Sequence, residues 1–142
     1  MFKTLALVAL LGVVGVFAQH GEVAQLTPKN FNEIVMHSPK AAFVKFYAPW
    51  CGHCVKLAPA WVELAKAFAS TPNVVIAELD GEKYSDFIYE HAVLGFPTVR
   101  LYTKTHENGI IISEYEGQRE ETAARDVSAF TAFLKQHGVH AP

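Results

Sequence analysis

Short runs of apolar residues alternate along the chain with segments whose apolar residues recur three and four positions apart. The runs at 41–48 (AAFVKFYA) and 73–80 (NVVIAELD) are nearly continuous, which is typical of strands covered on both faces of a sheet. Shorter runs at 23–26, 98–103 and 110–115 predict further strands. The sequence Asn-Gly between the last two runs predicts that they form a hairpin.

Helices are expected between these strands and after the last one. Thr27 is the expected N-cap of the first helix, with Pro28 in its first turn. The later helices are expected after the turn at 49–54, over 83–92 and over 120–137. The order β-α-β-α-β-α-β-β-α predicts an α/β domain with a central mixed sheet and helices on both faces.

The first eighteen residues have the plan of a secretory signal peptide. Lys3 precedes the uncharged run 4–18, and the small residues Val16 and Ala18 predict cleavage after Ala18. The run is short for a transmembrane anchor, which needs ~20 residues. We therefore expect one domain over 19–142, free of the membrane after cleavage and in an oxidising compartment. The chain ends in VHAP without a KDEL-type signal, so we expect it in the endoplasmic reticulum lumen or secreted.

The composition fits one folded domain and narrows the class of partner. A chain of 142 residues with 51% hydrophobic and 18% charged residues is not that of a disordered protein. The net charge of −2 gives no reason to expect nucleic acid as a partner. Two cysteines are too few for a disulfide-rich mini-fold or a four-cysteine zinc site.

The two cysteines lie at a predicted strand-to-helix junction and are the candidate catalytic residues. The N–H groups and dipole of the helix N-terminus favour a thiolate at Cys51, which makes Cys51 the candidate nucleophile. His53 can add positive charge or a hydrogen bond, and Gly52 keeps the turn open. Cys54 lies one turn into the helix, so we expect it to be more buried and to act as the resolving thiol.

A structural role for these cysteines fits less well. A disulfide across so short a loop would stabilise the fold by only about 2 kcal/mol, which suits a reversible bond better than a permanent one. A zinc site needs further ligands, and the histidine pair with a ligand spacing, His137 and His140, lies on the last turn and the tail. We therefore expect dithiol redox chemistry with no metal and no organic cofactor.

The run 46–54 (FYAPWCGHC) resembles the active-site segment of the protein disulfide isomerase family. The similarity continues through 57–61 (LAPAW), 95–98 (GFPT) and 115–119 (YEGQR), and so covers nearly the whole mature chain. It implies one thioredoxin-fold domain that oxidises and isomerises disulfides. The implied partners are unfolded or misoxidised secretory proteins, with glutathione or an upstream oxidase as the redox partner.

The same resemblance implies a substrate site beside the cysteines. The peptide bond between Phe96 and Pro97 should be cis, because the family has a cis-proline loop at this position. The backbone at Phe96 would then offer hydrogen bonds to an extended substrate. Trp50, Leu94, Phe96 and Pro97 should form an exposed apolar rim that holds unfolded chains.

A buried charge pair has its two charges exchanged relative to that family. The family has an acidic residue six positions before the first cysteine and a lysine on the next strand, whereas this chain has Lys45 and Glu78. We expect the two side chains to pair, because an unpaired buried charge is costly. Glu78, or a neutral Lys45, would then relay the Cys54 proton or tune its transfer. The alternative is that both charges reach solvent and do nothing.

A second departure lies in the proline loop. Leu94 stands where many members of the family have an arginine that tunes the second cysteine, and leucine cannot do this. Arg100 is nearby in the sequence, but strand alternation does not show whether it reaches the site.

Two other functions stay open at the level of sequence. One is a secreted thioredoxin-like disulfide reductase, and the other is a chaperone-type binding module whose thiols are incidental. The reduction potential separates the first from an isomerase, and substitution of the cysteines separates the second. The sequence does not indicate an oligomeric state.

Overall fold

The computed structural model describes residues 21–119 and 126–141. The expected signal peptide lies outside these residues, so it stays a prediction. Within the described part of the chain, no helix is long and apolar enough to cross a bilayer.

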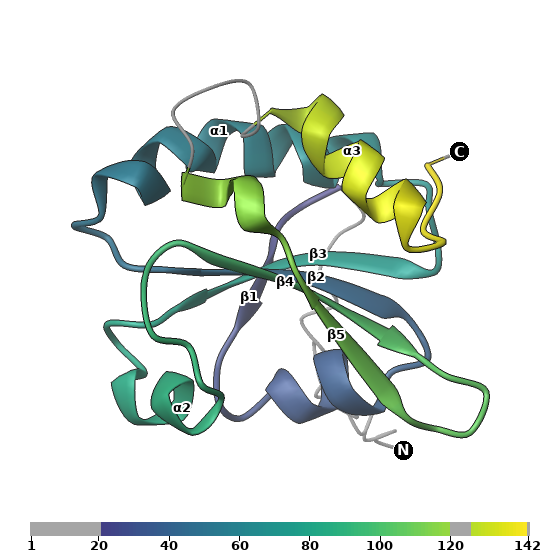
Figure 1. The fold of residues 1–142 in the computed structure, drawn as a ribbon, viewed down its shortest axis with the longest axis horizontal. Coiled ribbons are helices and arrows are strands. Elements are labelled where there is room, and N and C mark those ends of the chain that lie inside the picture. The colour runs from purple at the N-terminus through teal and green to yellow at the C-terminus, as the bar shows by residue number, and fades with distance from the viewer. Residues whose placement is uncertain (1–20, 120–125, 142) are drawn as a thin grey trace, which may run out of the picture.

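A mixed sheet with helices on both faces forms the domain, as the sequence predicts (Figure 1). The strand order is β1-β3-β2-β4-β5. Strands β1, β3 and β2 run parallel to one another, β4 is antiparallel to β2, and β5 is antiparallel to β4. The elements in chain order are β1 (Ala24–Leu26), a π-helix η1 (Asn32–His37), β2 (Ala41–Tyr47), α1 (Gly52–Ala67), β3 (Val74–Asp80), α2 (Ser85–Glu90), β4 (Thr98–Lys104), β5 (Ile110–Glu114), a 3-10 helix η2 (Glu116–Arg119) and α3 (Val127–Gln136).

The central strand β2 is buried on both faces, as its continuous apolar run predicts. On one face Phe43 packs with Trp61 of α1 and Phe130 of α3. On the other face Phe46 packs with Phe31, which directly precedes η1. Figure 1 shows α1 and α3 on the first side of the sheet and α2 with η1 on the second. Because β2 leads directly into α1, the sheet fixes the position of the junction that carries the cysteines.

The start of the first helix differs from the prediction. Thr27 is not an N-cap, because the helix begins at Asn32 and the capping position, Phe31, makes no side-chain bond. The Asn30 side chain organises the preceding turn instead. Its Oδ1 accepts from the Thr27 amide at 2.7 Å and its Nδ2 donates to the Gln25 carbonyl at 3.1 Å. An asparagine that bonds the backbone in this way favours a turn over a helix.

The helices α2 and α3 are shorter than predicted. The Asp80 carboxylate accepts from the amides of Glu82 and Lys83, both at 3.0 Å, which holds them in a turn before α2. Ala92 has a positive φ of 53° and ends that helix. Asp126 is extended and accepts a hydrogen bond from a first-turn amide, so α3 begins one residue later. The rest of the predicted helix, 120–125, lies outside the described residues.

Candidate redox site

The cysteines lie where the end of β2 turns into α1. Cys51 is the N-cap of α1, and its sulfur accepts a hydrogen bond from the Cys54 amide at 3.2 Å. The Cys51 amide donates to the Ala48 carbonyl at 3.1 Å, which closes the turn. Both cysteines are free thiols and are nearly buried, with 6% of Cys51 and 4% of Cys54 exposed. The Cys51 sulfur therefore lies at a helix N-terminus, as the sequence predicts.

Cys54 is held in its protonated form. Burial, followed by a hydrogen bond to the Cys51 side chain, raises the pKa of the Cys54 thiol to about 12. A backbone hydrogen bond at Ala48 and the positive charge of Lys45 act in the opposite direction and lower this pKa. Only a thiolate attacks a disulfide, so Cys54 needs help to lose its proton.

Lys45 and Glu78 face each other on adjacent strands and form the expected pair. The distance from Lys45 Nζ to Glu78 Oε2 is 2.8 Å, with 4% of the lysine side chain and 19% of the glutamate side chain exposed. Gln25 of β1 donates from Nε2 to the other carboxylate oxygen of Glu78 at 2.9 Å. The Lys45 ammonium also lies 5.2 Å from the centroid of the Tyr47 ring and 5.8 Å from that of the Trp61 ring. The alternative in which both charges extend into solvent is therefore wrong.

The expected rim is present in part. Trp50 and Leu94 are 68% and 87% exposed, and the half-buried Phe96 packs edge-on against Trp50 at 6.1 Å between ring centroids. Phe96 also packs against the buried cluster that contains Cys51. The Phe96–Pro97 bond is cis, as expected. Pro97 itself is buried directly before β4, so its place in an exposed rim was predicted wrongly.

Gly52 and His53 lie between the two cysteines. An added Cβ at Gly52 would meet no atom within 4 Å, so packing does not demand glycine there. His53 is half-buried in the first turn of α1. No group of three or more metal-ligating side chains occurs in the described ranges 21–119 and 126–141.

Sequence reasoning missed two residues of this region. Gly81 follows β3, and a Cβ there would lie 2.4 Å and 2.6 Å from two atoms of the Phe96 ring. The absence of a side chain at Gly81 therefore leaves the space that the Phe96 ring occupies. A glycine after a strand does not indicate such a specific contact in the sequence. Gln25 orients the carboxylate of Glu78 from β1, and only the parallel register of β1 and β3 shows that the two side chains meet.

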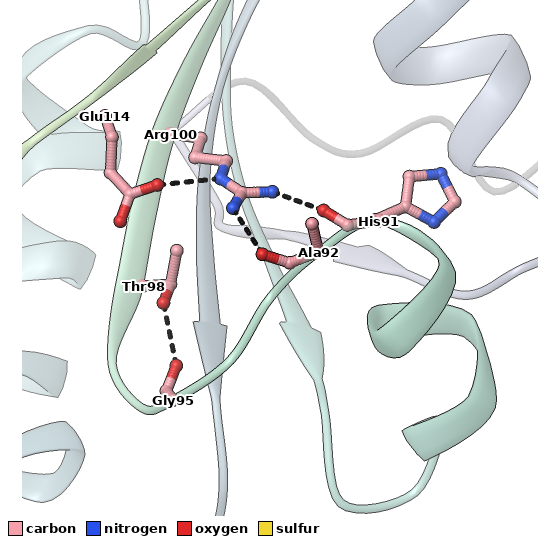
Figure 2. Close-up of polar contacts among 6 residues, drawn as sticks. All are labelled: His91, Ala92, Gly95, Thr98, Arg100 and Glu114. Carbon is pink, nitrogen blue, oxygen red and sulfur yellow. Dashed lines mark hydrogen bonds and ion pairs between the residues drawn. The ribbon is translucent and has the colours of Figure 1, made fainter.

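Arg100 does not take the place of the family's arginine beside the second cysteine. Its guanidinium carbon lies 5.9 Å from the centroid of the Phe46 ring. Phe46 points to the face of the sheet opposite the one on which its neighbour Lys45 lies, since side chains alternate along a strand. The sheet therefore separates Arg100 from Cys54. On its own side of the sheet, the Arg100 guanidinium donates to two carbonyls at the end of α2 (Figure 2).

Comparison with known proteins agrees with this architecture. The thioredoxin family model matches residues 22–129. A probable protein disulfide-isomerase A6 of Medicago sativa is 42% identical over 114 residues, which are 80% of this chain and 29% of that protein. The protein disulfide-isomerase tigA of Aspergillus niger is 34% identical over 137 residues, 96% of this chain and 35% of that protein. The chain thus spans about a third of the length of these relatives or less.

Solved structures show the same fold. The crystal structure of the Trx4 domain of ERdj5 superimposes with a TM-score of 0.69 at 27% identity, covering 81% of this chain and 94% of that domain. Human ERp44 superimposes with a TM-score of 0.65 at 29% identity, covering 81% of this chain and 29% of that structure.

Proposed function

The chain belongs to the thioredoxin family, and we propose that it is a thiol–disulfide oxidoreductase and isomerase that acts on protein substrates through Cys51 and Cys54. The observation that carries the proposal is the Cys51 sulfur at the N-terminus of α1, with the Cys54 thiol one turn behind it and buried. The relatives named protein disulfide isomerases support it. Trp50, beside Cys51, and Leu94, in the loop that contains Pro97, are exposed apolar side chains, which supports a protein substrate over a small molecule.

In the oxidising direction, the reaction begins with a disulfide between Cys51 and Cys54. A substrate thiolate attacks the Cys51 sulfur, and Cys54 leaves as a thiolate and takes up a proton. A second substrate thiolate then attacks the substrate sulfur of the mixed disulfide, and Cys51 leaves as a thiolate. The substrate has lost two electrons and gained a disulfide, and the protein holds both electrons as a dithiol.

In isomerisation the same steps run from the dithiol. The Cys51 thiolate attacks a wrong disulfide of the substrate, which forms a mixed disulfide and frees a substrate thiolate. That thiolate attacks another disulfide of the substrate and frees a second substrate thiolate. The second thiolate attacks the substrate sulfur of the mixed disulfide, and Cys51 leaves as a thiolate. A stalled complex is released when the Cys54 thiolate attacks Cys51. In this proposal reduced glutathione returns the Cys51–Cys54 disulfide left by that release to the dithiol, and oxidised glutathione or an upstream oxidase restores the disulfide after the oxidising reaction.

Lys45 and Glu78 tune the release step in this mechanism. The ammonium of Lys45 favours the Cys54 thiolate, which is the direction of its effect on the pKa of Cys54. Glu78 accepts from that ammonium at 2.8 Å and holds it in place. A positioned charge therefore replaces a general base, since an ammonium has no lone pair to accept a proton. Cys51, Cys54, Gly52 and His53 form the reacting segment.

The site of action is part of the proposal. The uncharged run at 4–18 supports entry into the secretory pathway, with residence in the endoplasmic reticulum lumen or secretion. The substrates would be unfolded or misoxidised proteins of that pathway. They would be held by Trp50, Leu94 and Phe96, with Pro97 forming the buried floor of the loop.

A redox titration tests the direction of the reaction. The purified protein is equilibrated with glutathione buffers, and the state of Cys51 and Cys54 is read by thiol trapping. A potential near about −180 mV supports an oxidase and isomerase, and one near about −270 mV supports a reductase. Cys51→Ser and Cys54→Ser variants serve as controls, because a chaperone with incidental thiols would still suppress aggregation of an unfolded protein after either change.

A further inference from the structure

The loop that carries Leu94 begins at an unusual helix end. The amides of Ala92 and Val93 donate to the carbonyls of Tyr89 and Ile88, at 3.0 Å and 2.9 Å. This is the Schellman pattern, in which the residue after the C-cap adopts a left-handed conformation. Glycine is usual there, but this chain has Ala92, with a φ of 53°. A Cβ disfavours that conformation, so the surrounding structure must hold it.

Arg100 of β4 supplies that hold (Figure 2). Its Nη1 donates to the His91 carbonyl at 2.7 Å and its Nη2 to the Ala92 carbonyl at 2.9 Å. Its Nε donates to Glu114 Oε2 of β5 at 3.1 Å, and 12% of the arginine side chain is exposed. One guanidinium thus joins the two last strands of the sheet to two successive carbonyls at the end of α2. These carbonyls lie beyond the helix and gain a charged donor.

The other end of the loop is fastened separately. Thr98 Oγ1 donates to the Gly95 carbonyl at 2.7 Å, as Figure 2 also shows. Between the two fastenings lies Leu94, which is 87% exposed, and Phe96 follows, packed against the cysteine cluster. The loop from Ala92 to Thr98 is therefore held by hydrogen bonds at both ends, and it exposes the apolar side chain of Leu94 between them.

We propose that Arg100 is the positioning residue of the substrate-binding loop, holding His91 and Ala92 so that Leu94 and Phe96 are presented to an extended, apolar segment of protein. The inference rests on the proposed function only in taking this loop as the binding surface. Arg100 lies on the face of the sheet opposite Lys45 and makes no contact with the thiols. Its removal should therefore weaken substrate binding without taking a charge away from Cys54.

The test uses Arg100→Met, which keeps the stem and removes the guanidinium. Hydrogen exchange of the Ala92 and Val93 amides, measured relative to amides of β2, reports the loop without any thiol chemistry. We expect these two amides to exchange at least tenfold faster. The dissociation constant of a fluorescent, extended, cysteine-free apolar peptide reports binding, and we expect it to rise at least fivefold.

A second change separates positioning from general loss of stability. Ala92→Gly removes the Cβ that opposes the left-handed conformation, so the double variant with Arg100→Met should regain at least half of the lost peptide affinity. Glu63→Gln breaks an exposed ion pair with Lys66 and is the matched control, expected to leave both readouts unchanged. If Arg100→Met does not fold, Glu114→Gln loosens the same guanidinium and should move both readouts in the same direction.

Each result decides the inference. Unchanged exchange of the two amides would overturn it, and so would faster exchange with unchanged peptide affinity, which would make Arg100 merely structural. Failure of the wild type to bind the peptide would overturn the loop as a binding surface. Disulfide exchange by the wild type is measured separately with glutathione, so a protein that binds the peptide but never cycles its thiols would refute the proposed function and leave this inference standing.

Discussion

Replacing Lys45 by methionine should slow the release of substrate from the mixed disulfide. The substitution keeps a long apolar stem beside Trp61 and removes the ammonium. Within the described residues, that ammonium is the side-chain charge that lowers the pKa of Cys54, so its loss raises this pKa above its value of about 12. The resolving thiolate then becomes rarer.

The magnitude follows from the thiolate population of Cys54. With a pKa of about 12, the thiolate is about one molecule in 30,000 at pH 7.5, compared with about one in 30 for the ordinary value of 9.0. Each further unit of pKa lowers this population tenfold. We expect release at pH 7.5 to slow at least about threefold. The fold should lose about 2 kcal/mol, less than for a fully buried pair, because Glu78 keeps some exposure and the Gln25 hydrogen bond.

The assay follows a single release event. The reduced protein is mixed with a fluorescent peptide whose one cysteine is activated as a disulfide with thionitrobenzoate. Cys51 attacks the peptide sulfur, thionitrobenzoate leaves and gives the burst of absorbance, and Cys54 then expels the peptide thiol. The first-order rate of that second step is recorded from pH 6 to pH 9. It should rise about tenfold per pH unit in both proteins, with the profile of Lys45→Met displaced to higher pH.

Glu78→Gln decides between a tuning charge and a proton relay. If Lys45 acts through its charge, the amide oxygen that replaces the carboxylate still accepts from the ammonium but no longer neutralises it, and release is as fast as in the wild type or faster. If Glu78 carries the proton away, release slows as much as in Lys45→Met. That second result would refute the proposal that a positioned charge replaces a general base. Both variants are compared at equal folded fraction, measured by urea unfolding.

Three further predictions concern stability. Gly81→Ala should cost about 1–3 kcal/mol in urea unfolding, since its Cβ would lie 2.4 Å from the Phe96 ring; Gly52→Ala, with open space around the new Cβ, is the control, and an equal loss in both would contradict the contact. Asp126→Ala should cost about 1 kcal/mol by removing the N-cap of α3, with Asp126→Ser restoring most of it. The raised pKa of Cys54 stabilises the reduced protein fully below about pH 9, and this contribution is lost as the pH rises towards about 12. The oxidised protein lacks that thiol, so its free energy of unfolding minus that of the reduced protein should increase between pH 8 and pH 10.5, and a constant difference would refute the assignment.

The sequence predicted the succession of strands and helices along the chain and the place of the cysteines, because both depend on local pattern. The continuous run of β2 and the junction that follows it are readable without knowing any distant contact. The pairing of Lys45 with Glu78 could also be predicted, since the adjacent strands and the cost of an unpaired buried charge leave few other solutions.

What could not be predicted depends on contacts between distant parts of the chain. Nothing near Arg100 in the sequence shows that its donors reach the carbonyls of His91 and Ala92, because the turn at 92 must first take a conformation that alanine disfavours. The prediction of where the first helix begins was wrong for a different reason. Asn30 and Thr27 are both good turn and cap residues, and propensity alone does not rank the two arrangements.

The Cys51 sulfur caps α1, and in the proposed mechanism the same atom reacts. A sulfur in a thiolate is a stronger acceptor than a neutral one, so a covalent bond at this atom weakens the start of the helix and its release as a thiolate strengthens it. Cys54 stands in that same first turn. The proposed mechanism therefore links the winding of one helical turn to turnover: we expect the turn to loosen in the covalent intermediate, when Cys54 attacks Cys51, and to tighten once the substrate has left.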